Sequence, residues 1–252
     1  MRRRIVNDRT SHMGLLGSLT MLILFVAIVA CIPALASETE THDDTFSVGA
    51  APKIVVSNDN GQIDVVTGNE GTVNVKATIR RPDDVEYSVV QEGDTVRVEA
   101  RVSFVWGFGT DAGADITVTL PADANVDLRT SNGGIGVVDI QNSGKLRASN
   151  GRISLENVKG EFEVNTSNGD IDFRGETTAD GMNRLTTSNG SVEVTLLSKP
   201  SVKLDATTSN GEIICKLPIV ATETGVNRLV GVVGEGDAVL VIETVNGSIT
   251  IQ

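Results

Sequence analysis

The fold is decided by the twelve-residue stretch FEVNTSNGDIDF, residues 162–173. Apolar and polar residues alternate on both sides of its central Ser167-Asn168-Gly169. A period of two is typical of a β-strand with one buried face, so the stretch predicts two short strands joined by a bend. Glycine accepts a positive φ at little cost, and asparagine tolerates the left-handed region and can bond its own backbone. Both residues therefore suit the bend.

The same bend recurs along the chain at regular intervals, which indicates a repeat architecture. From Asn132 onward, successive bend asparagines lie 18, 18, 21, 21 and 36 residues apart. Because 36 equals two of the shorter units, we infer that a coil between Asn210 and Asn246 has lost its Asn-Gly. The predicted structural turns are Asn60, Gly61, Asn132, Gly133, Asn150, Gly151, Asn168, Gly169, Asn189, Gly190, Asn210, Gly211, Asn246 and Gly247.

Two architectures satisfy this pattern: a parallel β-solenoid with Asn-Gly at one corner of every coil, or antiparallel hairpins with Asn-Gly as a two-residue turn. We favour the solenoid. A fixed repeat places identical corners above one another about 4.8 Å apart, where polar side chains can form a ladder while Val and Ile fill the interior. The ladder is interpreted as a structural row of corners rather than an adhesive face.

The remaining segments predict one all-β domain at residues 46–252, in which 46–128 are cap-like strands and 129–252 carry the repeats. A cap is expected because an open solenoid end exposes unpaired backbone groups. Residues 37–45 are predicted to be a linker. The strands expected in the cap region are Lys53–Ser57, Gln62–Val66, Thr72–Ile79, Tyr87–Gln91, Thr95–Val102 and Asp115–Leu120.

The first 36 residues are typical of an export element, because arginines precede a nearly uncharged apolar stretch, residues 14–36. Three outcomes stay open: cleavage after Ala36, retention as a membrane anchor, or lipid attachment at Cys31. The flanking charges predict a cytoplasmic N-terminus if the segment is uncleaved. The rest of the chain is predicted to be extracytoplasmic, either membrane-anchored or secreted.

Composition excludes several classes of function. The formal charge is −12, and the first 36 residues contribute +3, which leaves −15 for an exported part with few aromatic residues. Nucleic acid is therefore not an expected partner. Cys215 is the single cysteine after the leader, so an intrachain disulfide there is impossible and a buried apolar role is expected. No metal site and no cofactor are predicted.

An enzyme is not predicted, because the two histidines fall outside the repeats. His12 lies in the leader and His42 lies in the expected mobile start of the exported chain. Asp170 and Asp172 could form a carboxylate pair or bind calcium, but solvated outward positions explain them better. Trp106 and Phe108, on a glycine-rich segment, are speculative contact residues, and a hydrophobic plug over the cap is the competing interpretation.

These features together resemble the "putative adhesin" or DUF4097 family of β-strand-repeat envelope proteins. The resemblance rests on the segment NDNGQIDV at residues 58–65, ITVTLP at 116–121, the Ser-Asn-Gly repeats, the segment 230–236 and the ending VNGSI at 245–249. It implies a right-handed solenoid-like β fold, a surface or membrane-associated location and no catalytic residues.

We therefore expect a structural or adhesive module whose partner is an unidentified protein or glycan at the cell surface, with the membrane contacted through the N-terminal segment. An envelope scaffold or signalling accessory protein that contacts other membrane proteins is the alternative. A polysaccharide-active β-helix enzyme ranks third.

Overall fold

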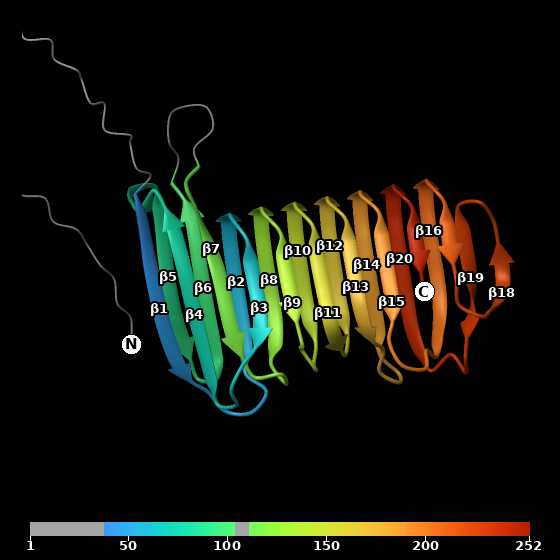
Figure 1. The fold of residues 1–252 in the computed structure, drawn as a ribbon, viewed down its shortest axis with the longest axis horizontal. Coiled ribbons are helices and arrows are strands. Elements are labelled where there is room, and N and C mark those ends of the chain that lie inside the picture. The colour runs from blue at the N-terminus through green and yellow to red at the C-terminus, as the bar shows by residue number, and fades with distance from the viewer. Residues whose placement is uncertain (1–37, 104–110) are drawn as a thin grey trace, which may run out of the picture.

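The computed structural model describes residues 38–103 and 111–252, which form an elongated stack of two β-sheets (Figure 1). Sheet A has ten strands and sheet B has eleven. A short 3-10 helix, Pro82–Asp84, lies between two strands near the N-terminal end. The spatial order in sheet A is β1 (Thr39–Ser47), β4 (Thr72–Arg80), β7 (Gly113–Leu120), β3 (Ile63–Thr67), β9 (Ile135–Val138), β11 (Ile153–Lys159), β13 (Ile171–Glu176), β15 (Val192–Leu196), β21 (Ile249–Ile251) and β17 (Ile213–Cys215).

Sheet B faces sheet A across the core and runs the length of the same stack (Figure 1). Its spatial order is β18 (Ile219–Thr224), β19 (Arg228–Val233), β16 (Val202–Asn210), β20 (Ala238–Asn246), β14 (Met182–Asn189), β12 (Phe162–Asn168), β10 (Gly144–Asn150), β8 (Asn125–Asn132), β2 (Lys53–Asn60), β6 (Thr95–Val102) and β5 (Val85–Glu92).

The repeating unit is a coil made of one strand in sheet B, an Asn-Gly bend and one strand in sheet A. Seven coils have this form: β2–β3, β8–β9, β10–β11, β12–β13, β14–β15, β16–β17 and β20–β21. Equivalent strands of neighbouring coils pair in parallel, as β10 does with β12 and β11 with β13. The solenoid prediction is therefore confirmed over the hairpin alternative, and antiparallel pairs are confined to the two ends.

The core lies between the sheets and is filled by the alternate, inward-facing residue of each strand. Leu146, Val164 and Leu185 show the pattern in adjacent coils, each at most 1% exposed. Phe162 meets Phe173 edge to ring at a centroid distance of 6.3 Å. Gly144 makes room for Phe162, because a Cβ on Gly144 would lie 2.8 Å from the ring. These aliphatic layers produce the stack by burying the inward face of the strands between its two ends.

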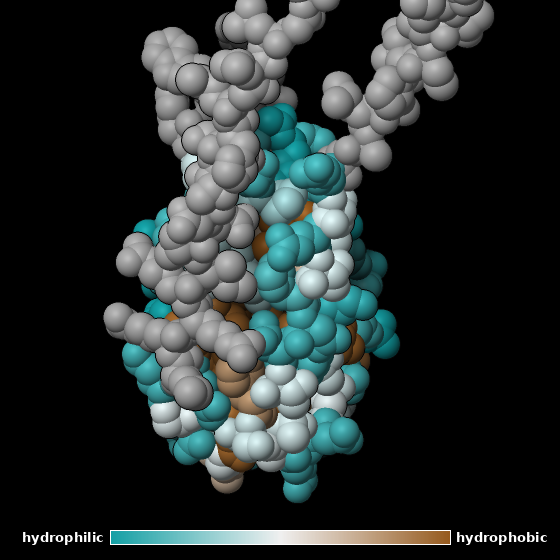
Figure 2. Space-filling view, turned by 90° about the vertical axis from the view of Figure 1, so that its left-hand side faces the viewer, coloured by the Kyte–Doolittle hydropathy of each residue, from teal (hydrophilic) through white to brown (hydrophobic). Residues whose placement is uncertain are grey.

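The N-terminal end is closed by strands that pair antiparallel with one another. In sheet A, β4 pairs with β7, and β1 pairs with β4. In sheet B, β5 pairs with β6. Figure 2 looks at this end, where hydrophilic residues surround smaller hydrophobic areas.

Three expectations for this region differ from the structure. The expected linker 37–45 mostly belongs to β1, because the alternation through Phe46 lets its inward side pack on the core. His42, expected in a mobile start, stacks on Tyr87 at a centroid distance of 5.0 Å. Within the expected cap, β2–β3 is a full coil, because Asn60 and Gly61 continue the bend column. The six strands expected from residue 53 to residue 120 are all present.

The C-terminal end departs from the order of the sequence. The last coil, β20–β21, inserts between β14–β15 and β16–β17, so Asn246 lies between Asn189 and Asn210. The inference that a coil between Asn210 and Asn246 had lost its Asn-Gly is wrong. Those residues instead form β17 and the β18–β19 hairpin, which extends sheet B beyond β16.

Candidate functional site: the bend column and the outer faces

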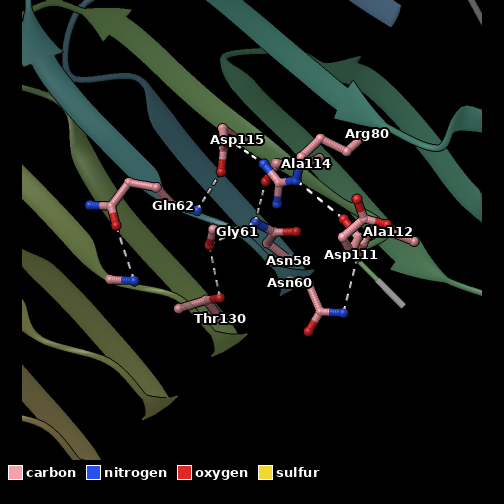
Figure 3. A network of polar contacts seen from close by, with 11 residues as sticks. Asn58, Asn60, Gly61, Gln62, Arg80, Asp111, Ala112, Ala114, Asp115 and Thr130 are labelled. Atoms are coloured by element: carbon pink, nitrogen blue, oxygen red, sulfur yellow. Dashed lines mark hydrogen bonds and ion pairs between the residues drawn. The ribbon is translucent and has the colours of Figure 1, made fainter. Parts of the chain in front are cut away.

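The bend asparagines form one continuous ladder of side-chain amides. Each Nδ2 donates to the Oδ1 of the asparagine in the next coil, over 2.7 to 2.9 Å. At the N-terminal end, Asn60 Nδ2 donates to the Ala112 carbonyl over 3.2 Å (Figure 3). The members in spatial order are Asn60, Asn132, Asn150, Asn168, Asn189, Asn246 and Asn210. The predicted stacked polar ladder is thus present.

The bend glycines are required by the closeness of the neighbouring coil. A Cβ on Gly169 would lie 2.1 Å from the carbonyl oxygen of Gly151, and a Cβ on Gly151 would lie 1.9 Å from that of Gly133. Neither Gly169 nor Gly151 has a positive φ, so the expected reason for glycine does not hold for them. The backbone N–H of Gly169 donates to the Asn189 carbonyl over 2.9 Å, which ties the coils together.

A buried row of threonines supports the bend from inside, and the sequence analysis missed it. Each hydroxyl donates to a bend-glycine carbonyl of the next coil, as Thr187 Oγ1 does to Gly169 over 2.9 Å. The sequence does contain a signal for this row, because the residue before Ser-Asn-Gly is threonine in most repeats. Asn58 takes this place at the N-terminal end and donates to the Gly61 and Ala114 carbonyls (Figure 3). The other members are Thr130, Thr166, Thr208 and Thr244.

Replacing an asparagine within the ladder should destabilise the stack. Asn168→Ala removes two amide hydrogen bonds, to Asn150 and from Asn189. We expect a loss of about 1–2 kcal/mol in the free energy of unfolding, measured by chemical denaturation. Asn165→Ala, on the exposed face of the same strand, is the control and should change it by less than about 0.5 kcal/mol. Equal costs for the two variants would contradict a stabilising ladder.

Asp170 and Asp172 lie on the outer face of sheet A and share Arg152. The guanidinium is 2.9 Å from Asp170 and 3.3 Å from Asp172. The Ser191 backbone N–H donates to Asp170 over 2.9 Å, and this bond, helped by Arg152, lowers the pKa of Asp170. Burial raises the pKa of Asp172 despite Arg152. The pair is therefore a surface ion-pair cluster, as expected for outward positions.

The two carboxylates should affect stability in opposite ways. Because its folded pKa is lowered, ionised Asp170 stabilises the fold at neutral pH, and this contribution is lost as the pH falls through that pKa. Asp170→Asn should therefore cost about 1 kcal/mol at pH 7, after allowing for solvent screening, and less near pH 3. Asp172→Asn should cost nothing at pH 7, because a raised pKa means that the ionised carboxylate is disfavoured. Thermal melts of both variants across pH check this, and a larger loss for Asp172→Asn would contradict it.

The outer face of sheet B carries a hollow of about 540 Å³ across the first residues of β8, β10, β12 and β14. Its lining includes Lys145, Glu163 and Arg184, which alternate in charge along one row. Met182, which is 52% exposed, lies at its edge, and the outward-facing Val239 is the register partner of Met182. The hollow and these apolar residues make one mixed apolar and charged contact area, here called the sheet B patch.

Of the remaining residues that the sequence singled out, the structure describes Cys215. Trp106, Phe108, Cys31 and the expected export segment lie outside the described residues. Cys215 lies in β17 with a free thiol, but it is partly exposed rather than buried, because β17 is an edge strand.

Across residues 38–103 and 111–252, no group of three or more His, Cys, Asp or Glu side chains could hold a metal ion. The same residues contain no helix long and apolar enough to cross a membrane.

Comparisons with known proteins agree with this geometry. The Toastrack DUF4097 family matches residues 124–252, just over half of the chain. No curated protein matches the sequence. A structure described as a "putative cell adhesion protein" from Clostridium sporogenes is similar with a TM-score of 0.51 at 15% identity, covering 84% of this chain and 99% of its own. This likeness shows the fold.

Two further solved structures align over most of the chain. A "putative adhesin" from Bacteroides fragilis aligns with a TM-score of 0.33 at 11% identity, covering 86% of this chain and 99% of its own. A "putative lipid binding protein" from Parabacteroides distasonis aligns with a TM-score of 0.31 at 12% identity, covering 86% of this chain and 98% of its own.

Proposed function

Because this chain belongs to the Toastrack DUF4097 family, we propose that it is a non-catalytic contact module of the cell envelope, exported and either held by its N-terminal segment or released. The observation that carries the proposal is the unbroken seven-asparagine ladder. It joins the coils into one stiff body with two long outer faces. Such a body offers area for contact with a surface partner.

The sheet B patch is the part of that area best suited to a protein partner. Met182 supplies an exposed apolar anchor, with Val239 and Val241 beside it on the neighbouring strand. Arg184 forms an ion pair with Glu243 over 2.8 Å at the border of this group. Apolar residues surrounded by charged ones are typical of protein interfaces. The outer face of sheet A has no exposed large hydrophobic residue in its central strands, β3 to β15, where the outward-facing Val66 and Val138 are only partly exposed.

The location is tested by fractionating cells that express the full chain and determining the mature N-terminus. An envelope or medium fraction supports export, and a chain found entirely in the cytoplasm contradicts it. Fractionation reports where the protein is located. A binding assay is needed to identify the face that contacts a partner.

Contact through the sheet B patch is tested by binding of the protein to isolated envelopes. The variant Met182→Glu/Val239→Glu should bind at least tenfold less. Thr195→Glu, on the outer face of sheet A, is the matched control and should bind as the wild type does. Protease treatment of the envelopes separates a protein partner from a glycan. Unchanged binding of the double variant would overturn the assignment of this face.

A further inference from the structure

The two sheets end at different levels at the C-terminal end of the stack. The last coil here is β16–β17, and sheet A stops at its strand β17. Sheet B continues past β16 with two more strands, β19 and then β18 (Figure 1). Within the described part of the chain, the β18–β19 hairpin therefore has no strands of sheet A opposite it. The end has the form of a step that is two strands deep.

The strand edge at this step is open. The Glu212 carbonyl accepts from Ile249, and the Lys216 N–H donates to Ile251, so alternate residues of β17 face β21. The backbone groups of Ile213 and Cys215 consequently point to the outer edge, where no strand of the described residues pairs with them. An unpaired edge of this kind is a template for another strand.

Apolar side chains are exposed around the same edge. Ile214 is 40% exposed, Val220 is 75% exposed and Val226 is 81% exposed. They make up three of the five exposed large hydrophobic residues among those described. Ala221 is on the inward side of β18 and is nevertheless exposed, because no strand of sheet A among the described residues lies opposite β18. Burial of these groups would stabilise an assembly.

The opposite end of the stack lacks these features. Its edge strand β1 carries Glu40, Asp43 and Asp44, and its edge strand β5 carries Glu86 and Glu92. Charges on edge strands are the usual protection against pairing with another chain. Strand β18 has a single charged residue and β17 has none. The unprotected end is therefore specifically the C-terminal one.

We propose that two copies of this chain associate through their C-terminal steps, about a two-fold axis parallel to the strands. Such an axis brings sheet A of one copy into line with sheet B of its partner. The two-strand overhang of each copy then fills the two strand positions missing from the other. Edge strand β17 meets the partner's β18, and the partner's β17 meets β18 in return, as an isologous interface requires.

The strand directions agree with this arrangement. Strands β16 and β17 run in opposite directions, since they are the two sides of one coil, and β18 is parallel to β16 after two antiparallel steps. A rotation about an axis parallel to the strands keeps their direction, so β17 and the partner's β18 pair antiparallel. The inward faces of both sheets also stay inward. Ile214 and the partner's Val220 then lie on the same outer surface and bury each other.

The test measures self-association of the full chain by analytical ultracentrifugation between about 1 and 100 µM, the range of weak to moderate affinities. We expect a monomer–dimer equilibrium. Ile214→Lys adds a charge to the open edge and should raise the dimer dissociation constant at least tenfold. Val245→Lys, at the exposed corner of β20 and 47% exposed in the wild type, is the matched control and should leave it unchanged.

Amide hydrogen exchange of the wild type provides a second readout that does not depend on any variant folding. The amides of Ile213 and Cys215 should exchange more slowly as the concentration rises, and the edge strand β5 should not change. A wild type that stays monomeric, a dimer that is indifferent to Ile214→Lys, or protection at β5 instead of β17 would overturn the proposal. No other partner is present in these assays, so failure of self-association leaves the envelope-contact function to be judged by its own experiment.

Discussion

Gly169→Ala should be among the most damaging single substitutions in the protein. The added methyl group would lie 2.1 Å from the Gly151 carbonyl oxygen and 2.5 Å from its carbon, both of them backbone atoms held in the sheet. The coils must move apart or the bend must distort, and either change breaks hydrogen bonds of the asparagine ladder. We expect a loss of about 3 kcal/mol or more in the free energy of unfolding, measured by urea denaturation.

The control for this substitution is Ser167→Ala, two residues away in the same bend. Ser167 is exposed, so its replacement should change the free energy of unfolding by less than about 0.5 kcal/mol. Gly93→Ala is a further control, because Gly93 has a positive φ but nothing within 4 Å of an added Cβ. A smaller cost at Gly169 than at Gly93 would contradict close approach as the reason for glycine.

Removing the last coil should disrupt the whole C-terminal half. A chain ending at Asp237 lacks β20 and β21, which separate β14 from β16 and β15 from β17. The buried side chains Leu240, Ile242 and Ile249 would leave the core, and four internal strand edges, two in each sheet, would lose their partners. We expect the melting transition to fall by more than about 10 °C, or aggregation before it, since several kilocalories per mole of burial are lost.

This prediction has both a control and a rescue. A chain ending at Ile251 loses only Gln252, with its hydrogen bonds to Val194, Leu196 and Lys216, so its melting temperature should fall far less than that of the chain ending at Asp237. A peptide of residues 238–252 added to the shortened chain should restore the transition, because the gap between β14 and β16 has the shape of one coil. An unchanged melting temperature in the shortened chain would mean that the last coil contributes little to the core.

The repeating part of the fold could be predicted because each strand and each bend is identified by residues that are close together in the sequence. Alternation around Ser167-Asn168-Gly169 identifies the strands and the bend, and equal spacing implies a common column. The ladder and the parallel coils follow from these two observations. The role of the bend glycines was harder to derive, because the 2.1 Å between an added Cβ on Gly169 and the Gly151 carbonyl oxygen depends on how the coils stack.

The arrangement of the strands at the two ends could not be predicted. A period of two in the sequence identifies a strand, but it indicates neither the direction of that strand nor its place in the sheet. The alternation in β20 would be the same at the end of the stack or inside it. The turn Glu92-Gly93-Asp94, with a positive φ at Gly93, was a usable hairpin signal for the antiparallel pair β5 and β6. The sheet B patch could not be predicted either, because it combines residues from strands that are distant in the sequence.

The insertion of β20–β21 between two earlier coils also governs when the protein can finish folding. A ribosome synthesises the chain from its N-terminus, so β20 and β21 emerge after both of the coils that flank them in space. The nascent polypeptide therefore keeps a vacant position between β14 and β16 until residues 238–251 have been synthesised, and premature docking of β16 against β14 would be a kinetic trap. The stack is therefore completed by the coil that follows both of its spatial neighbours in the sequence.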